Sequence, residues 1–241
     1  MPRYGLVEEL RAVKDEDELD AIRRAAVASN TAFERFADEG DVIGRTEREL
    51  AWRFEQLLHE ANADGVAFAV TMASGPNSAK PHTELSDRVV EPGDVLLVDA
   101  GCMVDGYCSD CTRTFATGPL PDELRRAYEA CLDAELAGLD AVRPGASGPG
   151  VDSAARDRIV AAGLGEAFGH GLGHGVGLVV HEAPRLAQES RSVLEAGNVV
   201  TVEPGIYLSG LGGIRIEDLV IVTDGRPEVL TTFTKDLVTL D

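Results

Sequence analysis

Two aspartates, Asp99 and Asp110, stand where carboxylates could act together. Asp99 lies at the end of an apolar stretch that is typical of a strand, residues 95–100. A buried carboxylate without a partner costs several kcal/mol, so an acid in this place needs a cation or a metal ion. A hairpin centred near residues 104 and 105 would pair position 99 with position 110 and bring the two backbones to about 5 Å. The plainer alternative is that Asp110 is an acid beside a hairpin turn, where Asp is common.

A glycine-rich segment, HGLGHGVGLVVH, contains three of the five histidines: His170, His174 and His181. Glycine occupies every second position from 169 to 177. Each glycine costs a helix about 1 kcal/mol relative to alanine, so the spacing of the first two histidines is not that of a helical zinc site. Glycines instead permit close approach of the backbone, which suits a binding site. A lone histidine is more often structural, but three within one such segment favour a functional site.

Two glutamates occupy comparable positions further along the chain. Glu203 ends a predicted strand in the run TVEPGIY, and Pro204 stops the strand there. Glu217 lies inside the apolar run GGIRIEDLVIV, and Arg215 precedes it by two residues on the same face. Arg215 and Glu217 could also form an ordinary ion pair on the surface of a sheet.

Together these residues supply four carboxylates and at least one imidazole. Two divalent cations would balance the charge of four carboxylates. Oxygen-rich ligands with a single imidazole suit Mn²⁺, Co²⁺, Fe²⁺ or Zn²⁺. Two such ions about 3.5–4 Å apart can hold a hydroxide nucleophile and polarise a carbonyl group. The sequence therefore predicts a two-metal hydrolytic site.

The elements that must position these residues form one α+β domain, and no linker divides the chain. A T-x-x-E capping box at Thr46 and Glu49 predicts the start of one helix, and Gly65 is expected to close it. The predicted helices cover about residues 15–39, 46–63, 121–142 and 151–162. The predicted strands cover residues 66–72, 95–100, 108–116, 199–202, 214–222 and 229–232.

One sequence pattern occurs twice. Residues 91–99 read EPGDVLLVD, and residues 195–203 read EAGNVVTVE. Each segment predicts a turn, then a strand, then a carboxylate at the strand's end. The repeat indicates two halves related by a pseudo-two-fold axis, each delivering a carboxylate to a shared centre. Chance recurrence of a turn and a strand is the alternative.

The composition narrows the class of protein. The 241 residues carry a formal charge of −20, which argues against nucleic acid binding because that needs a clustered basic surface. No apolar run could span a membrane, and no apolar signal segment opens the sequence, so we expect a cytoplasmic protein. The acidic, lysine-poor composition suits high salt and makes a halophilic source a hypothesis. The CxxC pair Cys108 and Cys111 lies on a predicted strand without a second such pair, so we expect reduced thiols.

At this point the chain resembles a known family. The motifs VDAG, SDCTRTF, HGLGHGVGLVVHEAP, VEPGIY and GGIRIED occur in the order found in the Xaa-Pro peptidases, the prolidase and aminopeptidase P group of the pita-bread metallopeptidases (M24). The resemblance covers nearly the whole chain. It implies an α+β pita-bread fold, with an antiparallel sheet flanked by helices and an internal pseudo-two-fold. It also implies metal-dependent hydrolysis of the Xaa-Pro bond at the N-terminus of peptides by a hydroxide that bridges two metal ions.

The resemblance assigns ligands to two divalent ions, with manganese as first choice and cobalt, zinc or iron as alternatives. It implies that Asp99 chelates one ion, that Asp110 and Glu217 bridge the two, and that His174 and Glu203 bind the other. Glu203 would also take a proton from the bridging water.

The resemblance also implies residues on the substrate side. His181 matches a histidine near the scissile peptide that can stabilise the tetrahedral intermediate or transfer protons. His82 matches another substrate-side histidine. His170 matches one that shapes the pocket for the residue after the scissile bond. Arg215 matches an arginine beside the bridging glutamate.

Several alternatives stay open. Methionine aminopeptidases and other pita-bread hydrolases share the fold, and some relatives use it as a non-catalytic binding module. The motifs do not separate a dipeptidase from an aminopeptidase. We expect residues 1–14 to be a lead-in segment and residues 15–241 to be the catalytic domain, without the N-terminal domain usual in the family. That domain commonly contributes to dimer contacts, so a homodimer is not decided. Peptides with proline at the second position are the expected partners.

Overall fold

The computed structural model describes residues 5–81 and 83–241 of the chain. Within them the helices are α1 (Leu6–Ala12), α2 (Glu16–Glu39), α3 (Glu47–Glu60), α4 (Asp122–Ala141) and α5 (Gly148–Ala161). The strands are β1 (Gly65–Val66), β2 (Thr71–Ser74), β3 (Val95–Ala100), β4 (Cys102–Val104), β5 (Tyr107–Cys108), β6 (Cys111–Ala116), β7 (Gly173–Gly175), β8 (Glu182–Leu186), β9 (Val199–Val202), β10 (Gly205–Leu208), β11 (Gly212–Arg215), β12 (Asp218–Ile221) and β13 (Glu228–Val229). Two short 3₁₀ helices cover Gly75–Ala79 and Gly165–Ala167. The predicted α+β class is confirmed.

Capping boxes define where α2 and α3 begin. Thr46 and Glu49 form the predicted capping box at the start of α3, and α2 starts with a box of the same kind. The predicted end of α3 was wrong. Asn62 adopts a left-handed conformation with φ of 68° just after the helix, so the chain has already turned before Gly65, which pairs in β1. The short helix α1 was not predicted.

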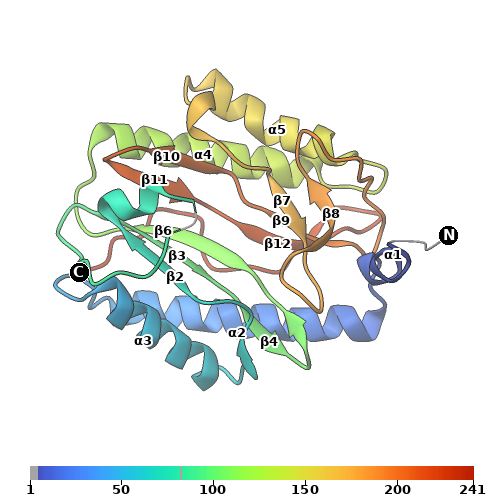
Figure 1. Ribbon diagram of the computed structural model, residues 1–241, viewed down its shortest axis with the longest axis horizontal. Coiled ribbons are helices and arrows are strands. Elements are labelled where there is room, and N and C mark those ends of the chain that lie inside the picture. The colour runs from blue at the N-terminus through green and yellow to red at the C-terminus, as the bar shows by residue number, and fades with distance from the viewer. Residues whose placement is uncertain (1–4, 82) are drawn as a thin grey trace.

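The strands of the described residues form four sheets, of which β1, β4 and β5 make up one and β10 and β11 another. Of the other two, β2, β3 and β6 form the first, which is antiparallel, while β13, β12, β9, β7 and β8 form the second. In Figure 1 the strands lie between two pairs of helices, α2 with α3 and α4 with α5. One core cluster joins α2 and α3 to the first sheet, and another joins α4 and α5 to the second. A third cluster joins the first turns of α2 to β9 and β12, so the packing follows the expected two halves only in part.

The repeated sequence pattern forms the same turn in both halves. Gly93 and Gly197 each have φ of 88°, a value that favours glycine. The residue after each glycine, Asp94 or Asn198, accepts a side-chain hydrogen bond from the backbone nitrogen three positions earlier. The strands β3 and β9 follow these turns. Shared turn geometry supports the internal repeat over chance recurrence.

The register predicted for the hairpin after β3 was wrong by two residues. Asp99 lies opposite Thr112 rather than Asp110. Asp105 and Gly106 have φ values of 52° and 81°, and a two-residue turn of type I′ needs positive φ at both positions. The hairpin is therefore centred between these two residues, one position later than expected. Asp110 lies in the gap between β5 and β6.

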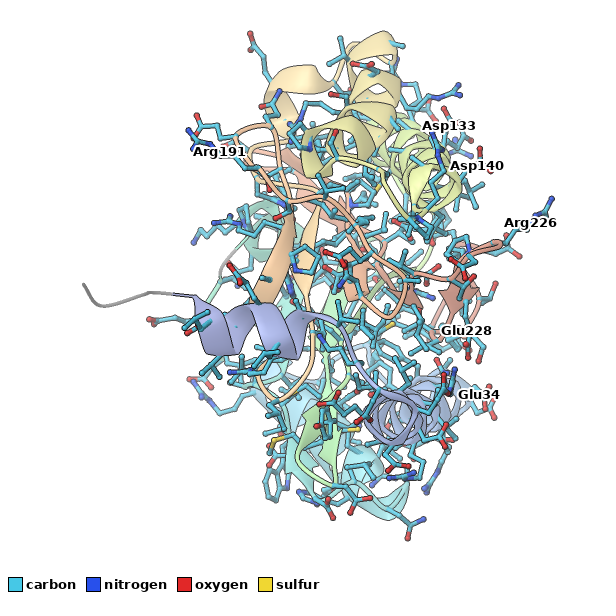
Figure 2. All side chains as sticks on the ribbon, turned by 90° about the vertical axis from the view of Figure 1, so that its right-hand side faces the viewer. Glu34, Asp133, Asp140, Arg191, Arg226 and Glu228 are labelled. Carbon is cyan, nitrogen blue, oxygen red and sulfur yellow. The ribbon has the colours of Figure 1, made fainter. Side chains whose placement is uncertain are left out.

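The acidic excess lies on the surface. Figure 2 shows side chains such as Glu34, Asp133, Asp140 and Glu228 at the edge of the molecule. The four cysteines are buried and form no disulfide, as expected. None of the helices in the described part of the chain combines the length and apolarity needed to cross a bilayer.

Candidate metal centre

A cavity of about 910 Å³ is lined by residues from both halves of the fold. It contains every predicted site residue that the structure describes: Asp99, Asp110, His170, His174, His181, Glu203, Arg215 and Glu217. The remaining one, His82, lies outside the described residues. Residues more than one hundred positions apart in the sequence thus share one cavity wall.

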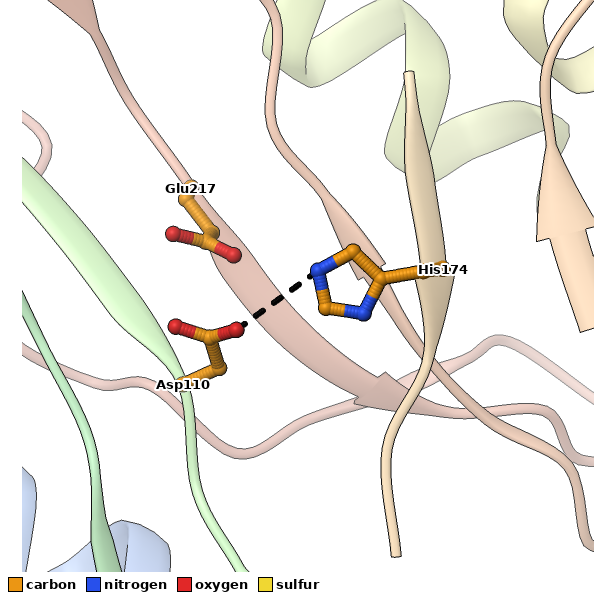
Figure 3. Close-up of side chains that lie close together, drawn as sticks. All are labelled: Asp110, His174 and Glu217. Carbon is orange, nitrogen blue, oxygen red and sulfur yellow. Dashed lines mark ion pairs between the residues drawn. The ribbon is translucent and has the colours of Figure 1, made fainter. Parts of the chain in front are cut away.

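Three side chains converge at the centre of this cavity. Potential ligand atoms of Asp110, His174 and Glu217 all lie within 4.8 Å of one another (Figure 3). The Nε2 atom of His174 lies 3.6 Å from Oδ2 of Asp110 and 3.3 Å from Oε1 of Glu203. Each of these residues comes from a different segment, because Asp110 precedes β6, His174 is in β7, and Glu217 precedes β12. One divalent cation could contact several of them at once.

Glycines allow β7 to carry His174 between two neighbouring backbones. A Cβ atom on Gly173 would lie 2.0 Å from the carbonyl oxygen of Thr201, and one on Gly175 would lie 2.1 Å from that of Ala183. The backbone N–H of His174 donates to Oγ1 of Thr201. Nδ1 of His174 donates to the carbonyl oxygen of Gly175 at 3.1 Å, which leaves Nε2 as the ligand atom facing the carboxylates.

Arg215 connects two of the carboxylates. Its guanidinium donates to Oδ2 of Asp99, to the hydroxyl of Tyr207 and to Oγ1 of Thr112. The Thr112 hydroxyl in turn donates to Oε2 of Glu217 at 2.6 Å. Arg215 therefore pairs with Asp99 and reaches Glu217 only through a threonine. The alternative of an Arg215–Glu217 pair on a sheet surface is wrong, because both residues are buried and the arginine is used elsewhere.

The electrostatics of the cluster favour a bound cation. Burial, followed by repulsion from neighbouring carboxylates, raises the pKa of Asp110 and of Glu217 well above the ordinary range. Burial also raises the pKa of Asp99, although Arg215 opposes the effect. Burial would raise the pKa of Glu203 as well, but the hydrogen bond and charge of His174 together with other cations lower it. Without metal, the site holds more negative charge than its own cations balance.

The donor set fits divalent metal ions. Oδ1 of Asp99 is buried and, within the described part of the chain, has no hydrogen-bond partner. A buried carboxylate oxygen without a donor is rare, and a cation is one partner that would satisfy it. Four carboxylates and one imidazole are also the ligand types that suit manganese, iron, cobalt or zinc.

Two further histidines lie beside this centre. The ring of His181 lies 4.2 Å from the ring of His174, centroid to centroid. Nε2 of His170 lies 2.9 Å from the hydroxyl of Tyr207, and its Nδ1 lies 2.8 Å from the carbonyl oxygen of Gly171. Tyr207 thus joins His170 to Arg215.

Side chains from α5 hold the segment that leads into β7. Asp152 is fully buried and accepts from the backbone N–H of Leu172 and from Arg156. Arg156 donates to the carbonyl oxygens of Phe168 and His170, and its guanidinium lies 4.1 Å from the centroid of the Phe168 ring. Ionic and polar contacts therefore order a stretch that has too many glycines to form a helix.

Sequence reasoning did not single out several residues of the cavity. Tyr207 lines the cavity, and Thr112 is buried beside it with its hydroxyl on Glu217. Both lie within quoted motifs, VEPGIY and SDCTRTF, so their hydroxyls close to predicted ligands were a usable signal. Other cavity residues had no distinguishing spacing: Phe68, Thr71, Pro81, Arg185, Ser190, Arg191 and Ser192.

Comparisons with known proteins agree with this site. The profile of metallopeptidase family M24 matches residues 20–224. An Xaa-Pro dipeptidase of Pyrococcus furiosus is 39% identical over 233 residues, which cover 97% of this chain and 67% of that protein. An uncharacterized peptidase, YqhT, of Bacillus subtilis is also 39% identical, over 100% of this chain and 68% of that protein.

Solved structures show the same fold. The Xaa-Pro dipeptidase from Bacillus anthracis matches with a TM-score of 0.97 and 43% identity, over 100% of this chain and 67% of that chain. The X-Pro aminopeptidase from Thermotoga maritima matches with a TM-score of 0.94 and 41% identity, over 97% of this chain and 66% of that chain. The chain thus spans about two thirds of the length of these relatives.

Proposed function

Because this chain belongs to metallopeptidase family M24, we propose that it hydrolyses the Xaa-Pro bond at the N-terminus of peptides with the help of two divalent metal ions. The observation that carries the proposal is the convergence of the predicted ligands on one cavity, where a buried oxygen of Asp99 has no hydrogen-bond partner among the described residues. Relatives described as Xaa-Pro dipeptidases and an X-Pro aminopeptidase support the proline specificity.

Five residues would hold the metal ions. We assign Asp99 to one ion, Asp110 and Glu217 to both, and His174 and Glu203 to the other, with manganese as first choice. When bound, the ions would supply a hydroxide nucleophile and polarise the scissile carbonyl group. Arg215 would keep Asp99 oriented through the hydrogen bond to its Oδ2.

Other residues of the cavity would act on protons and on the peptide. Glu203 is proposed as the general base, because its carboxylate lines the cavity with Oε1 3.3 Å from Nε2 of His174, beside the cluster that would hold the metal ions. His181, beside His174, would stabilise the charge that develops on the scissile carbonyl oxygen. His170 would shape the pocket for the residue after the scissile bond. His82 stays a proposed substrate-side residue on the resemblance alone.

Hydrolysis of Ala-Pro and of Ala-Pro-Ala-Ala tests the proposal. The chelator-treated protein would be assayed in low and high salt with Mn²⁺, Co²⁺, Zn²⁺ or Fe²⁺ added. Cleavage that needs the metal is the expected result, and the ratio of the two rates separates a dipeptidase from an aminopeptidase. Glu203→Gln should lower kcat by about 10²-fold or more. A different outcome would favour the methionine aminopeptidase alternative. In that outcome the protein binds metal and cleaves a peptide that begins with methionine, but cleaves neither proline peptide.

A further inference from the structure

The strand that carries Glu217 is interrupted at that residue. The sequence predicts one strand over residues 214–222, but β11 ends at Arg215 and β12 begins at Asp218. β11 pairs with β10, whereas β12 pairs with β9 and β13. Glu217 therefore lies outside the strand pairings of residues 5–81 and 83–241. Its carbonyl oxygen accepts from the guanidinium of Arg113, at 2.5 Å.

Arg113 lies behind the carboxylate cluster and donates hydrogen bonds to several groups there. Its exposed fraction is 1%, and it donates to four backbone carbonyl groups as well as to the carboxylate of Asp218. The four carbonyl groups belong to Thr112, Glu217, Phe233 and Thr234. The Thr112 hydroxyl donates to the Glu217 carboxylate, which lines the cavity, so Arg113 holds the backbones of both of these residues from behind.

Asp218 is shared between two cations. It is fully buried, and its Oδ1 accepts from Arg113 at 2.9 Å. Its Oδ2 accepts from Nζ of Lys235 at 2.6 Å. The Lys235 side chain is 23% exposed and approaches from the C-terminal segment. Oδ1 also accepts from the Thr231 hydroxyl at 2.8 Å, so loss of the ammonium would remove the donor of Oδ2 alone. Oδ2 would then attract Arg113, which would draw the guanidinium away from the Glu217 carbonyl.

The residue type at position 235 suits its place beside Asp218. Only three of the 22 basic side chains are lysines, so arginine is used almost everywhere else. A compact ammonium can occupy one carboxylate oxygen, whereas a planar guanidinium tends to engage both. One oxygen of Asp218 already belongs to Arg113. Lysine is therefore the cation that completes this pair without displacing Arg113.

We propose that Lys235 is a positioning residue, which acts through Asp218 and Arg113 to hold Glu217 in the orientation that binds both metal ions. The inference rests on the proposed function only in treating Glu217 as a metal ligand. It assigns a role in the site to a C-terminal segment that contributes no residue to the cavity lining.

Mn²⁺ binding to the chelator-treated full chain tests the proposal, with isothermal titration calorimetry and the electron paramagnetic resonance signal of a coupled manganese pair as readouts. Lys235→Met is expected to weaken Mn²⁺ binding about 10–100-fold and to reduce the coupled signal. Lys235→Arg should restore the affinity only in part, because it keeps the positive charge beside Asp218 while its guanidinium competes with Arg113 for the second oxygen. Arg125→Met is the matched control, because Arg125 forms an exposed ion pair with Asp122 on α4 and should leave binding unchanged. Lys235→Gln serves if the Met variant does not fold.

A double variant distinguishes a role of Lys235 in positioning Glu217 from a role in folding stability alone. With Asp218→Asn as background, Lys235→Met should have little additional effect on Mn²⁺ affinity, because the two residues act along one path. If Lys235→Met lowers only the melting temperature of the metal-free protein and leaves Mn²⁺ affinity unchanged, the proposal is overturned. A wild-type protein that binds Mn²⁺ but cleaves no Xaa-Pro peptide refutes the proposed function and leaves this test valid. A wild-type protein that binds no divalent ion refutes both.

Discussion

The pair between Asp152 and Arg156 offers the sharpest test of how the histidine segment is held. Asp152 is fully buried, and the Arg156 side chain is 14% exposed. Arg156→Met would leave a buried carboxylate without its cation and would remove the donor from two carbonyl groups. Breaking a buried pair by removing one partner costs about 3–5 kcal/mol of folding free energy. We expect that loss for Arg156→Met.

Replacing both partners should cost less than replacing the arginine alone. The double variant Asp152→Leu with Arg156→Met removes the uncompensated buried charge, although the N–H of Leu172 and the carbonyl groups of Phe168 and His170 still lose their side-chain partners. We expect it to recover 1 kcal/mol or more of the stability lost in the single variant, about the penalty of one unsatisfied charged group.

Urea unfolding followed by circular dichroism, at constant salt and with chelator, measures these differences. Arg158→Met is the matched control, because Arg158 lies on the same helix, is 56% exposed and is 3.8 Å from its acidic partner Asp133. Its cost should stay within about 0.5 kcal/mol. If Arg156→Met costs no more than this control, the contacts of α5 do not order the histidine segment and the reasoning is refuted.

Three further outcomes follow from the site and the core. The pKa values of Asp110 and Glu217 are raised in the folded state, so that state binds protons more tightly than the unfolded chain does. The metal-free protein should therefore lose stability as the pH rises above the ordinary carboxyl range. Urea midpoints at pH 5 and pH 7 test this, and saturating Mn²⁺ should reverse the trend; a metal-free midpoint that is higher at pH 7 would contradict it. Gly173→Ala should abolish Mn²⁺ binding or folding, since its Cβ would lie 2.0 Å from the Thr201 carbonyl oxygen, and a variant with normal calorimetry would show that reasoning to be wrong. Burial raises the pKa of all four cysteine thiols, so Ellman's reagent at pH 8 should label none of them quickly in the native protein and all of them in denaturant; one fast-reacting native thiol would disprove this.

Much of the candidate site was predictable because its signals are local. Capping residues predict helix starts from chemistry within one turn, and the box at Thr46 was found in this way. The repeated turn before β3 and β9 is also local, because a glycine with positive φ and an Asx residue suffice to form it. Motif resemblance then assigned the ligands, and the described ones share one cavity.

The sequence by itself determined which residue types are present, where most helices begin, and that two similar turns each precede a carboxylate. Only the tertiary structure decided which atoms meet. The hairpin register depends on the two backbone conformations at Asp105 and Gly106, and moving its centre by one residue shifts the pairing by two. Arg215 pairs with Asp99 rather than with its sequence neighbour Glu217 because the chain changes sheets between them. Such partners are chosen by packing between distant segments, which no local pattern encodes.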